Sequence, residues 1–144
     1  RFDENFYQQK PEEAKEEADW VLNKLKQYNY TVDLPIAIDT EKSTEENGNG
    51  RADHLDIATR TAVCKTFAET IKANGYTPMI YASKNWFYDN LDMSQLLQYD
   101  TWLAHYADET DYKYHYEIWQ YTSSGSVLGI LGDTDLNYGY KKYW

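Results

Sequence analysis

The chain has one cysteine, few basic residues and no long apolar run. Because Cys64 stands alone, an internal disulfide and a cysteine-based zinc site are excluded. Only 14 Lys and Arg stand against 24 Asp and Glu, which gives a net charge of −10. That charge repels phosphate backbones, so nucleic acid is not an expected partner. No run reaches the roughly 18 apolar residues that a membrane span needs, so we expect no membrane insertion.

Aromatic residues, by contrast, are abundant. Fifteen Tyr, five Trp and four Phe make up 17% of the 144 residues. Tyr and Trp combine a flat apolar face with a polar edge, which suits sugar rings as well as protein cores. The aromatic content therefore favours a carbohydrate ligand only weakly. The length suits one domain, and we treat residues 1–144 as a single unit.

Two acids follow an apolar stretch at residues 34–38. Side chains along a strand repeat their direction every second residue, so Asp39 and Glu41 are expected on one face, with Cα atoms roughly 7 Å apart. Each carboxylate perturbs the protonation of the other, which suits acid-assisted chemistry on a neutral polar substrate. The alternative is that both are solvated loop residues or helix caps.

The spacing of apolar residues predicts alternating helices and strands. Helices are expected over residues 11–28 and 54–74, with Asp53 as the N-cap of the second and Gly75 as its left-handed end. This order favours an α/β fold, in which helices pack outside a parallel sheet. Shorter elements are predicted as strands at 34–38, 77–82, 101–107 and 116–122, helical turns at 84–88 and 93–98, a turn plus a short strand at 123–132, and an aromatic tail at 133–144.

Polar residues follow each predicted strand. Tyr81 ends one strand, His105 and Tyr106 end the next, and Gln120 ends a third. In parallel α/β folds these carboxyl ends meet at one edge, where the chemistry gathers. We therefore expect these side chains near the two acids, together with the Gly- and Asn-rich loop at 42–51, although His105 could equally be a hydrogen-bonded structural residue.

Several segments of the chain resemble glycoside hydrolase family 25, the lysozymes that cut the muramic acid side of the β-1,4 glycan of peptidoglycan. Each segment alone is a weak signal, but five occur in the right order over about residues 11–140. They are residues 34–41 (Leu-Pro-Ile-Ala-Ile-Asp-Thr-Glu), 75–81 (Gly-Tyr-Thr-Pro-Met-Ile-Tyr), 101–106 (Thr-Trp-Leu-Ala-His-Tyr), 118–125 (Ile-Trp-Gln-Tyr-Thr-Ser-Ser-Gly) and 132–137 (Gly-Asp-Thr-Asp-Leu-Asn).

The resemblance implies an irregular TIM-like β/α barrel with its site at the carboxyl mouth. Glu41 resembles the family's proton-donating glutamate, Asp39 its partner aspartate, and Asp135 the acid supplied by the last strand. It implies a secreted or phage-encoded lysin acting on peptidoglycan glycan strands in the cell wall, as a monomer and without a cofactor or metal. The residues similar to the lining of the family's glycan groove are Tyr81, Trp102, Tyr106, Trp119 and Gln120.

The start of the chain departs from the family pattern. Family members begin with a strand that carries Asp-x-Ser, and no such run stands before residue 34. Residues 3–6 (Asp-Glu-Asn-Phe) are similar to an earlier helix of the family, and the chain opens with Arg1. We therefore expect the sequence to be part of a longer chain, with the N-terminal part of the barrel absent.

Glycoside cleavage needs a carboxylic acid to protonate the leaving oxygen and a negative group to stabilise the cationic sugar. We expect Glu41 to be the acid and Asp39 to stay ionised. Two alternatives remain: a non-catalytic cell-wall glycan-binding module, which the missing aspartate would favour, and a chitinase-type hydrolase on a similar barrel. Asp53, His54 and Asp56 could suggest a metal, but a helix N-terminus explains acids at those positions.

Overall fold

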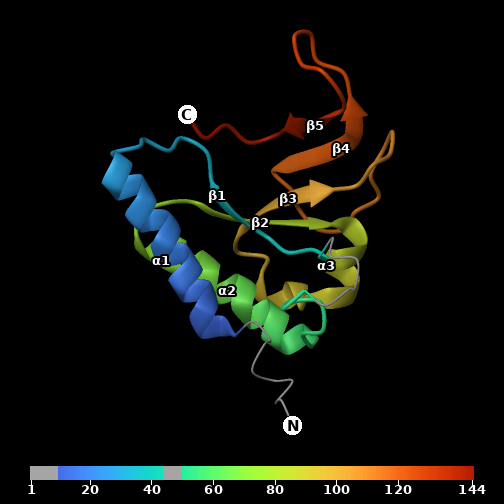
Figure 1. The fold of residues 1–144 in the computed structure, drawn as a ribbon. Helices are drawn as coiled ribbons and strands as arrows, with labels where there is room; N and C mark the ends of the chain where they lie inside the picture. Colours follow the sequence, from blue (N-terminus) through green and yellow to red (C-terminus); the bar gives the residue numbers. More distant parts are fainter. Residues whose placement is uncertain (1–9, 44–49) are drawn as a thin grey trace.

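The computed structural model describes residues 10–43 and 50–144 (Figure 1). The proposed likeness at residues 3–6 and most of the Gly- and Asn-rich loop, residues 44–49, lie outside them. The elements in chain order are α1 (Pro11–Tyr28), β1 (Ile36–Asp39), α2 (Ile57–Ala73), β2 (Pro78–Ser83), α3 (Lys84–Asn90), the 3₁₀ turn η2 (Met93–Gln95), β3 (Asp100–Ala104), β4 (Ile118–Gly125) and β5 (Thr134–Gly139).

The strands form one sheet in the order β1-β2-β3-β4-β5. β1 to β4 are parallel, which confirms the predicted α/β class with a parallel sheet and outer helices. Within the residues described, the sheet is open, with β1 and β5 at its two edges.

The last strand differs from the prediction. β5 is antiparallel to β4 and lies in the stretch that was predicted as an aromatic tail. Residues 126–133 connect the two strands as a hairpin, and a connection this short cannot carry the chain back for a parallel pairing. The strand expected within residues 123–132 is instead the end of β4, which continues to Gly125.

Helix α1 has the predicted bounds. The carboxylate of Glu13 accepts a hydrogen bond from the backbone N–H of Lys10 at 2.8 Å, which satisfies one of the free donors at the helix start. Ala14 and Ala18 are fully buried on the side of α1 that packs against α2. Figure 1 shows the two helices lying side by side on one side of the sheet.

Helix α2 begins three residues later than predicted. Its N-cap is Asp56, whose Oδ1 accepts a hydrogen bond from Thr59 N at 2.7 Å. Asp53, the predicted cap, instead accepts hydrogen bonds from the backbone N–H groups of Ser43 and Gly50 at 2.8 and 2.9 Å, joining the two ends of the loop. Gly75 has φ +86°, so the predicted left-handed end of this helix is confirmed.

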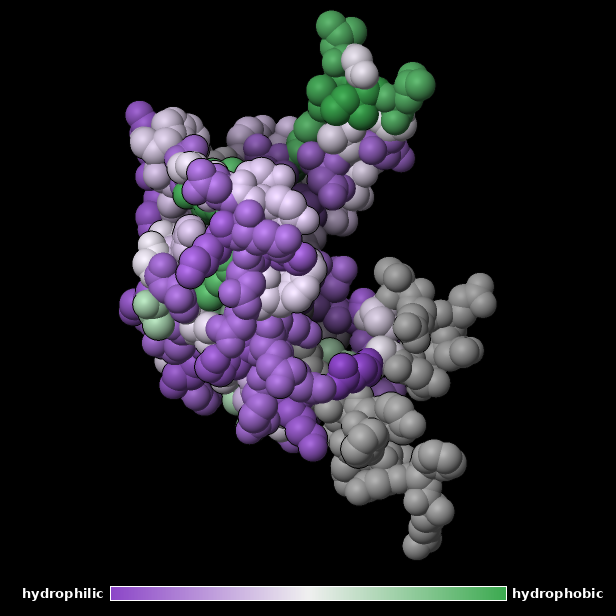
Figure 2. Space-filling view, turned by 60° about the vertical axis from the view of Figure 1, so that its left-hand side comes forward, coloured by the Kyte–Doolittle hydropathy of each residue, from purple (hydrophilic) through white to green (hydrophobic). Residues whose placement is uncertain are grey.

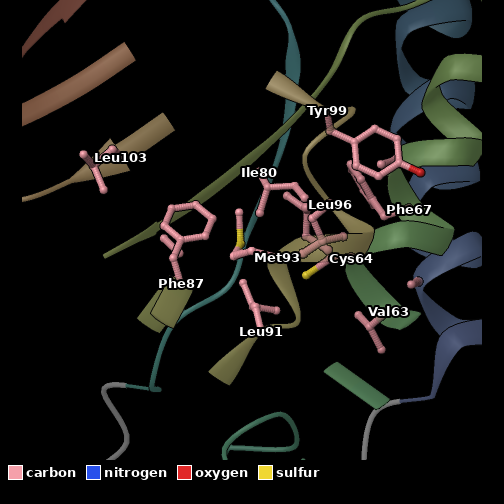
Figure 3. Close-up of a cluster of buried hydrophobic side chains, with 14 of the residues drawn as sticks. Val63, Cys64, Phe67, Ile80, Phe87, Leu91, Met93, Leu96, Tyr99 and Leu103 are labelled. Carbon is pink, nitrogen blue, oxygen red and sulfur yellow. The ribbon is translucent and has the colours of Figure 1, made fainter. Parts of the chain in front are cut away.

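The two faces of the sheet carry different side chains, because neighbouring residues of a strand point to opposite faces. One face packs against the helices through residues such as Ile80, Leu103 and Trp119. The cluster in Figure 3 joins that face to Phe67 of α2 and Phe87 of α3. The opposite face carries the side chains that form the candidate site.

The surface over the helices is mostly hydrophilic, whereas apolar colour gathers at the tip of the β4–β5 hairpin (Figure 2). Leu128 and Leu131 at this tip are fully exposed. Among the residues that the structure describes, no helix has the length and apolar character needed to cross a membrane.

Candidate active site

The candidate site begins at the carboxyl end of β1, where Thr40 separates the two predicted acids. Thr40 is buried, its backbone N–H donates to Tyr81 O at 3.0 Å, and its Oγ1 accepts from Trp86 Nε1 at 3.1 Å. With Thr40 held against the protein on both sides, Asp39 and Glu41 are left exposed. The anchored threonine therefore sets the position of both carboxylates.

Trp86 is itself held from two directions. Ser83 caps α3 by accepting a hydrogen bond from Trp86 N at 3.2 Å. This bond fixes the backbone of Trp86, from which the indole extends. The buried guanidinium of Arg60 lies over the indole, 4.7 Å from the ring centroid, and donates to the carbonyl oxygens of Ala52 and Leu55. Arg60 thus ties the chain before α2 to the tryptophan that anchors Thr40.

The protonation of Asp39 is perturbed by its surroundings. Partial loss of hydration, and then the charge of Glu41, raise the pKa of Asp39 to about 6. Asp39 thus keeps its proton at pH values well above those at which an aspartate ordinarily ionises. It is ionised at neutral pH and largely protonated below pH 5.

A cavity of about 380 Å³ opens beside Glu41. Its other walls come from the ends of β2 and β3 and the first residues of α3. The lining residues are Glu41, Tyr81, Ser83, Lys84, Asn85, Ala104, His105 and Tyr106.

Tyr81 and Tyr106 both bond to one side chain on β4. Each phenol hydroxyl donates to Oε1 of the buried Gln120, and both distances are 2.8 Å. The pKa of Tyr81 is raised, first by burial and further by the neighbouring phenol and the two carboxylates. The structure therefore brings Tyr81, Tyr106 and Gln120 together beside the acids, as the sequence predicted.

Trp102 extends this wall along the same face of the sheet. Its ring meets that of Tyr81 edge to face, with 5.1 Å between centroids. Its Nε1 donates to Oδ1 of Asn137 at 2.7 Å, and Asn137 is the cross-strand neighbour of Gln120. Asn137, which was not among the predicted site residues, thus holds the indole of a predicted groove residue.

Two predicted site residues lie elsewhere. Trp119 is buried at 6% exposure on the helix-facing side, and its Nε1 donates to the carbonyl oxygen of His105 at 2.8 Å. It adjoins Gln120 in the sequence, so the two side chains must take opposite faces of β4. Asp135 is exposed on β5, two residues before Asn137 and so on the same side of that strand, outside the lining of the cavity.

Three further residues near the cavity were not predicted from the sequence. Lys84 and Asn85 line the cavity because they directly follow β2. Their position at the carboxyl end of a predicted strand could have identified them as candidates from the sequence. Lys84 also pairs with Asp111 at 2.7 Å. Trp86 carried no signal, since its role depends on a contact with Thr40, which lies far from it in the sequence.

His105 lies at the cavity, whereas Cys64 lies in the core. His105 lines the cavity, and its Nδ1 also lies 2.9 Å from Thr110 Oγ1, so it is at once a wall residue and a hydrogen-bonded one. Cys64 is fully buried and its pKa is raised to about 12 by burial, as expected for a small core residue rather than a nucleophile.

The site consists of paired carboxylates and an aromatic wall at the carboxyl ends of parallel strands, the edge of an α/β sheet at which chemistry gathers. The chain belongs to glycosyl hydrolases family 25, whose sequence profile matches residues 5–130. A comparison with curated proteins found no match.

Solved structures agree with this family. The modular autolysin LytC from Streptococcus pneumoniae has a TM-score of 0.79 and 27% identity, over 91% of this chain and 31% of that one. The CTP1L endolysin has a TM-score of 0.67 and 25% identity, over 90% and 42%. The Cpl-1 endolysin, solved with a peptidoglycan analogue, has a TM-score of 0.60 and 25% identity, over 92% and 36%. The chain therefore spans less than half the length of each.

Proposed function

We propose that this chain forms part of a lysozyme that hydrolyses the β-1,4 bond between N-acetylmuramic acid and N-acetylglucosamine in peptidoglycan. The observation that carries the proposal is the pair Asp39 and Glu41, held on either side of an anchored Thr40 and beside a tyrosine-lined cavity. The family assignment supports it, and so do the solved relatives described as autolysins and endolysins.

In this proposal Glu41 donates the proton to the leaving glycosidic oxygen, because it is the acid that lines the cavity. Asp39 stabilises the positive charge that develops on the sugar, directly or by orienting the N-acetyl group of the substrate. The raised pKa of Asp39, about 6, restricts this role to higher pH, because the aspartate is mostly charged only above that pH.

Three of the remaining predicted residues bind the glycan in this proposal. Tyr81 and Tyr106 offer their rings and hydroxyls at the cavity, and Trp102 extends the wall. Asp135 contributes a third negative charge from β5. Trp119 supports the site from the core, since its ring is buried and its indole N–H holds the backbone of His105.

Clearing of purified cell walls tests the activity directly. The wild-type chain should lower the turbidity of a peptidoglycan suspension, and Glu41→Gln should abolish the clearing while leaving pull-down by the same walls unchanged. Binding without clearing by the wild type would instead identify a non-catalytic glycan-binding module.

The bond that is cut is tested by the products. Reduction of the new ends should label N-acetylmuramic acid and leave N-acetylglucosamine unlabelled. Preferential digestion of chitin oligomers would instead support a chitinase-type hydrolase on a similar barrel.

The setting of the protein is part of the same proposal. We propose an extracellular or cell-wall location, as expected of a secreted or phage-encoded lysin, and a monomer in which residues 1–144 belong to one catalytic domain. The descriptions of the relatives as autolysins and endolysins support the location. Sedimentation of the purified chain at the expected 17.0 kDa would support the monomer.

A further inference from the structure

Gln120 occupies an unusual position among the residues near the cavity. It is only 4% exposed, yet it lies on the polar face of the sheet. Its Oε1 accepts hydrogen bonds from Tyr81 and Tyr106. Tyr81 comes from β2 and Tyr106 follows β3, so one side-chain oxygen joins two neighbouring walls of the cavity.

The number of hydrogen bonds that this oxygen can accept determines whether the tyrosine hydroxyls can donate to a ligand or only accept from it. An amide carbonyl oxygen has two lone pairs, and here each receives one phenol proton. With their protons directed at Gln120, both phenol oxygens have only lone pairs left for other partners. Both tyrosines are therefore oriented as hydrogen-bond acceptors toward the cavity, although a free phenol can donate or accept.

Asn137 repeats the arrangement on the adjacent strand. Its Oδ1 accepts the indole N–H of Trp102, and the Trp102 ring packs against Tyr81. Gln120 and Asn137 are cross-strand partners. Two amide carbonyls thus take up the polar hydrogens of three aromatic residues, which fixes the ring positions as well as the direction of each hydrogen.

We propose that Gln120 is a positioning residue that holds Tyr81 and Tyr106 as acceptors, so that the cavity selects a ligand group with N–H or O–H donors, such as the acetamido N–H or a free hydroxyl of an amino sugar. The inference rests on the proposed function, because it concerns the ligand of the same site. Gln120 acts through the tyrosines and does not itself touch the sugar.

A thermodynamic cycle tests this role. The affinity of a soluble peptidoglycan tetrasaccharide is measured by calorimetry in the Glu41→Gln background, which prevents turnover. Gln120→Leu should weaken binding about tenfold, because two phenol hydroxyls lose their orientation. In the Tyr81→Phe/Tyr106→Phe background the same change should have less than a twofold effect, since no phenol proton remains to be oriented.

Gln120→Glu provides the rescue. Its carboxylate has a similar size and again accepts two phenol protons, so affinity should stay within about threefold of the parent above pH 7. Gln95→Leu, the same change at an exposed amide in η2, is the matched control and should leave affinity unchanged. If Gln120→Leu fails to fold, Gln120→Glu with and without the two tyrosines still completes a cycle.

The outcomes separate this inference from the proposed function. An equal loss from Gln120→Leu with and without the tyrosine hydroxyls would mean that Gln120 serves packing alone and would overturn the inference. Failure of Gln120→Glu to preserve affinity would do the same. A wild-type chain that neither clears cell walls nor binds the tetrasaccharide would instead overturn the proposed function.

Discussion

The two faces of the sheet differ in what covers them, and this difference separates stability from chemistry. On the helix-facing side, Ile80 and Leu103 belong to the buried cluster that includes residues of α2 and α3 (Figure 3). Trp119 is part of the same cluster. On the other side, Tyr81 and Gln120 occupy alternate positions of the same strands. Within one strand, one residue therefore packs in the core and the next belongs to the candidate site.

The polar face is stable because its polar groups satisfy one another. The hydroxyls of Tyr81 and Tyr106 bond to Gln120, and the indole N–H of Trp102 bonds to Asn137. A buried polar group without a partner costs about 1–3 kcal/mol, so these bonds are what allow Gln120 to be buried. The acids at the end of β1 remain exposed and available.

The largest expected difference between the faces is in activity. Glu41→Gln should lower kcat by about 10²–10⁴-fold, the usual contribution of a general acid. The melting temperature should change little, because Glu41 is exposed. Clearing rates and thermal melts measure both, with the exposed Glu12→Gln on α1 as control; a variant that clears walls at the parental rate would refute the assignment.

The matching change on the core face should do the opposite. Leu103 is fully buried, and Leu103→Ala should lower the free energy of unfolding by about 2–5 kcal/mol. Urea denaturation measures this loss. Below the transition, kcat should stay near the parental value, and a loss of kcat without a loss of stability would contradict the division between the faces.

Asp39 links charge to both properties. Because its folded pKa is about 6, above the value of a free aspartate, its ionisation between about pH 4 and 6 disfavours the folded state. Asp39→Asn should therefore melt at a higher temperature than the parent at pH 7 and show little difference near pH 4.

The same substitution tests the catalytic role of Asp39. If its charge is needed, parental activity should fall as the pH drops through about 6, and Asp39→Asn should be weakly active without that limb. Activity that instead falls as the pH rises through 6 would make Asp39 the proton donor. A pH–rate profile of kcat for both proteins distinguishes these outcomes.

The smallest effect is expected at the support beneath the acids. Trp86→Phe removes the indole N–H that bonds to Thr40 Oγ1 and keeps most of the ring beside Arg60. We expect a stability loss of about 1 kcal/mol and a severalfold lower kcat with an unchanged KM. Trp20→Phe, at an exposed tryptophan on α1, is the control.

Local patterns were sufficient for much of the fold. The bounds of α1, the left-handed Gly75 and the parallel pairing of β1 to β4 all follow from periodicity, helix-ending chemistry and the alternation of elements. Alternation along a strand is also enough by itself to place Trp119 and Gln120 on opposite faces of β4. The start of α2 was missed because Asp53 and Asp56 are equally good caps by residue type, and only the loop contacts of Asp53 distinguish them.

The sequence alone was enough to identify the family and to predict an acid pair and polar residues at the strand ends, because these depend on order and spacing along the chain. It could not show that Thr40 is anchored by Trp86, that Gln120 joins two tyrosines, or that Asp39 has a pKa of about 6. Each of these depends on groups from separate strands and helices coming within hydrogen-bond distance or removing water from one another. Such proximity exists only once the chain has folded.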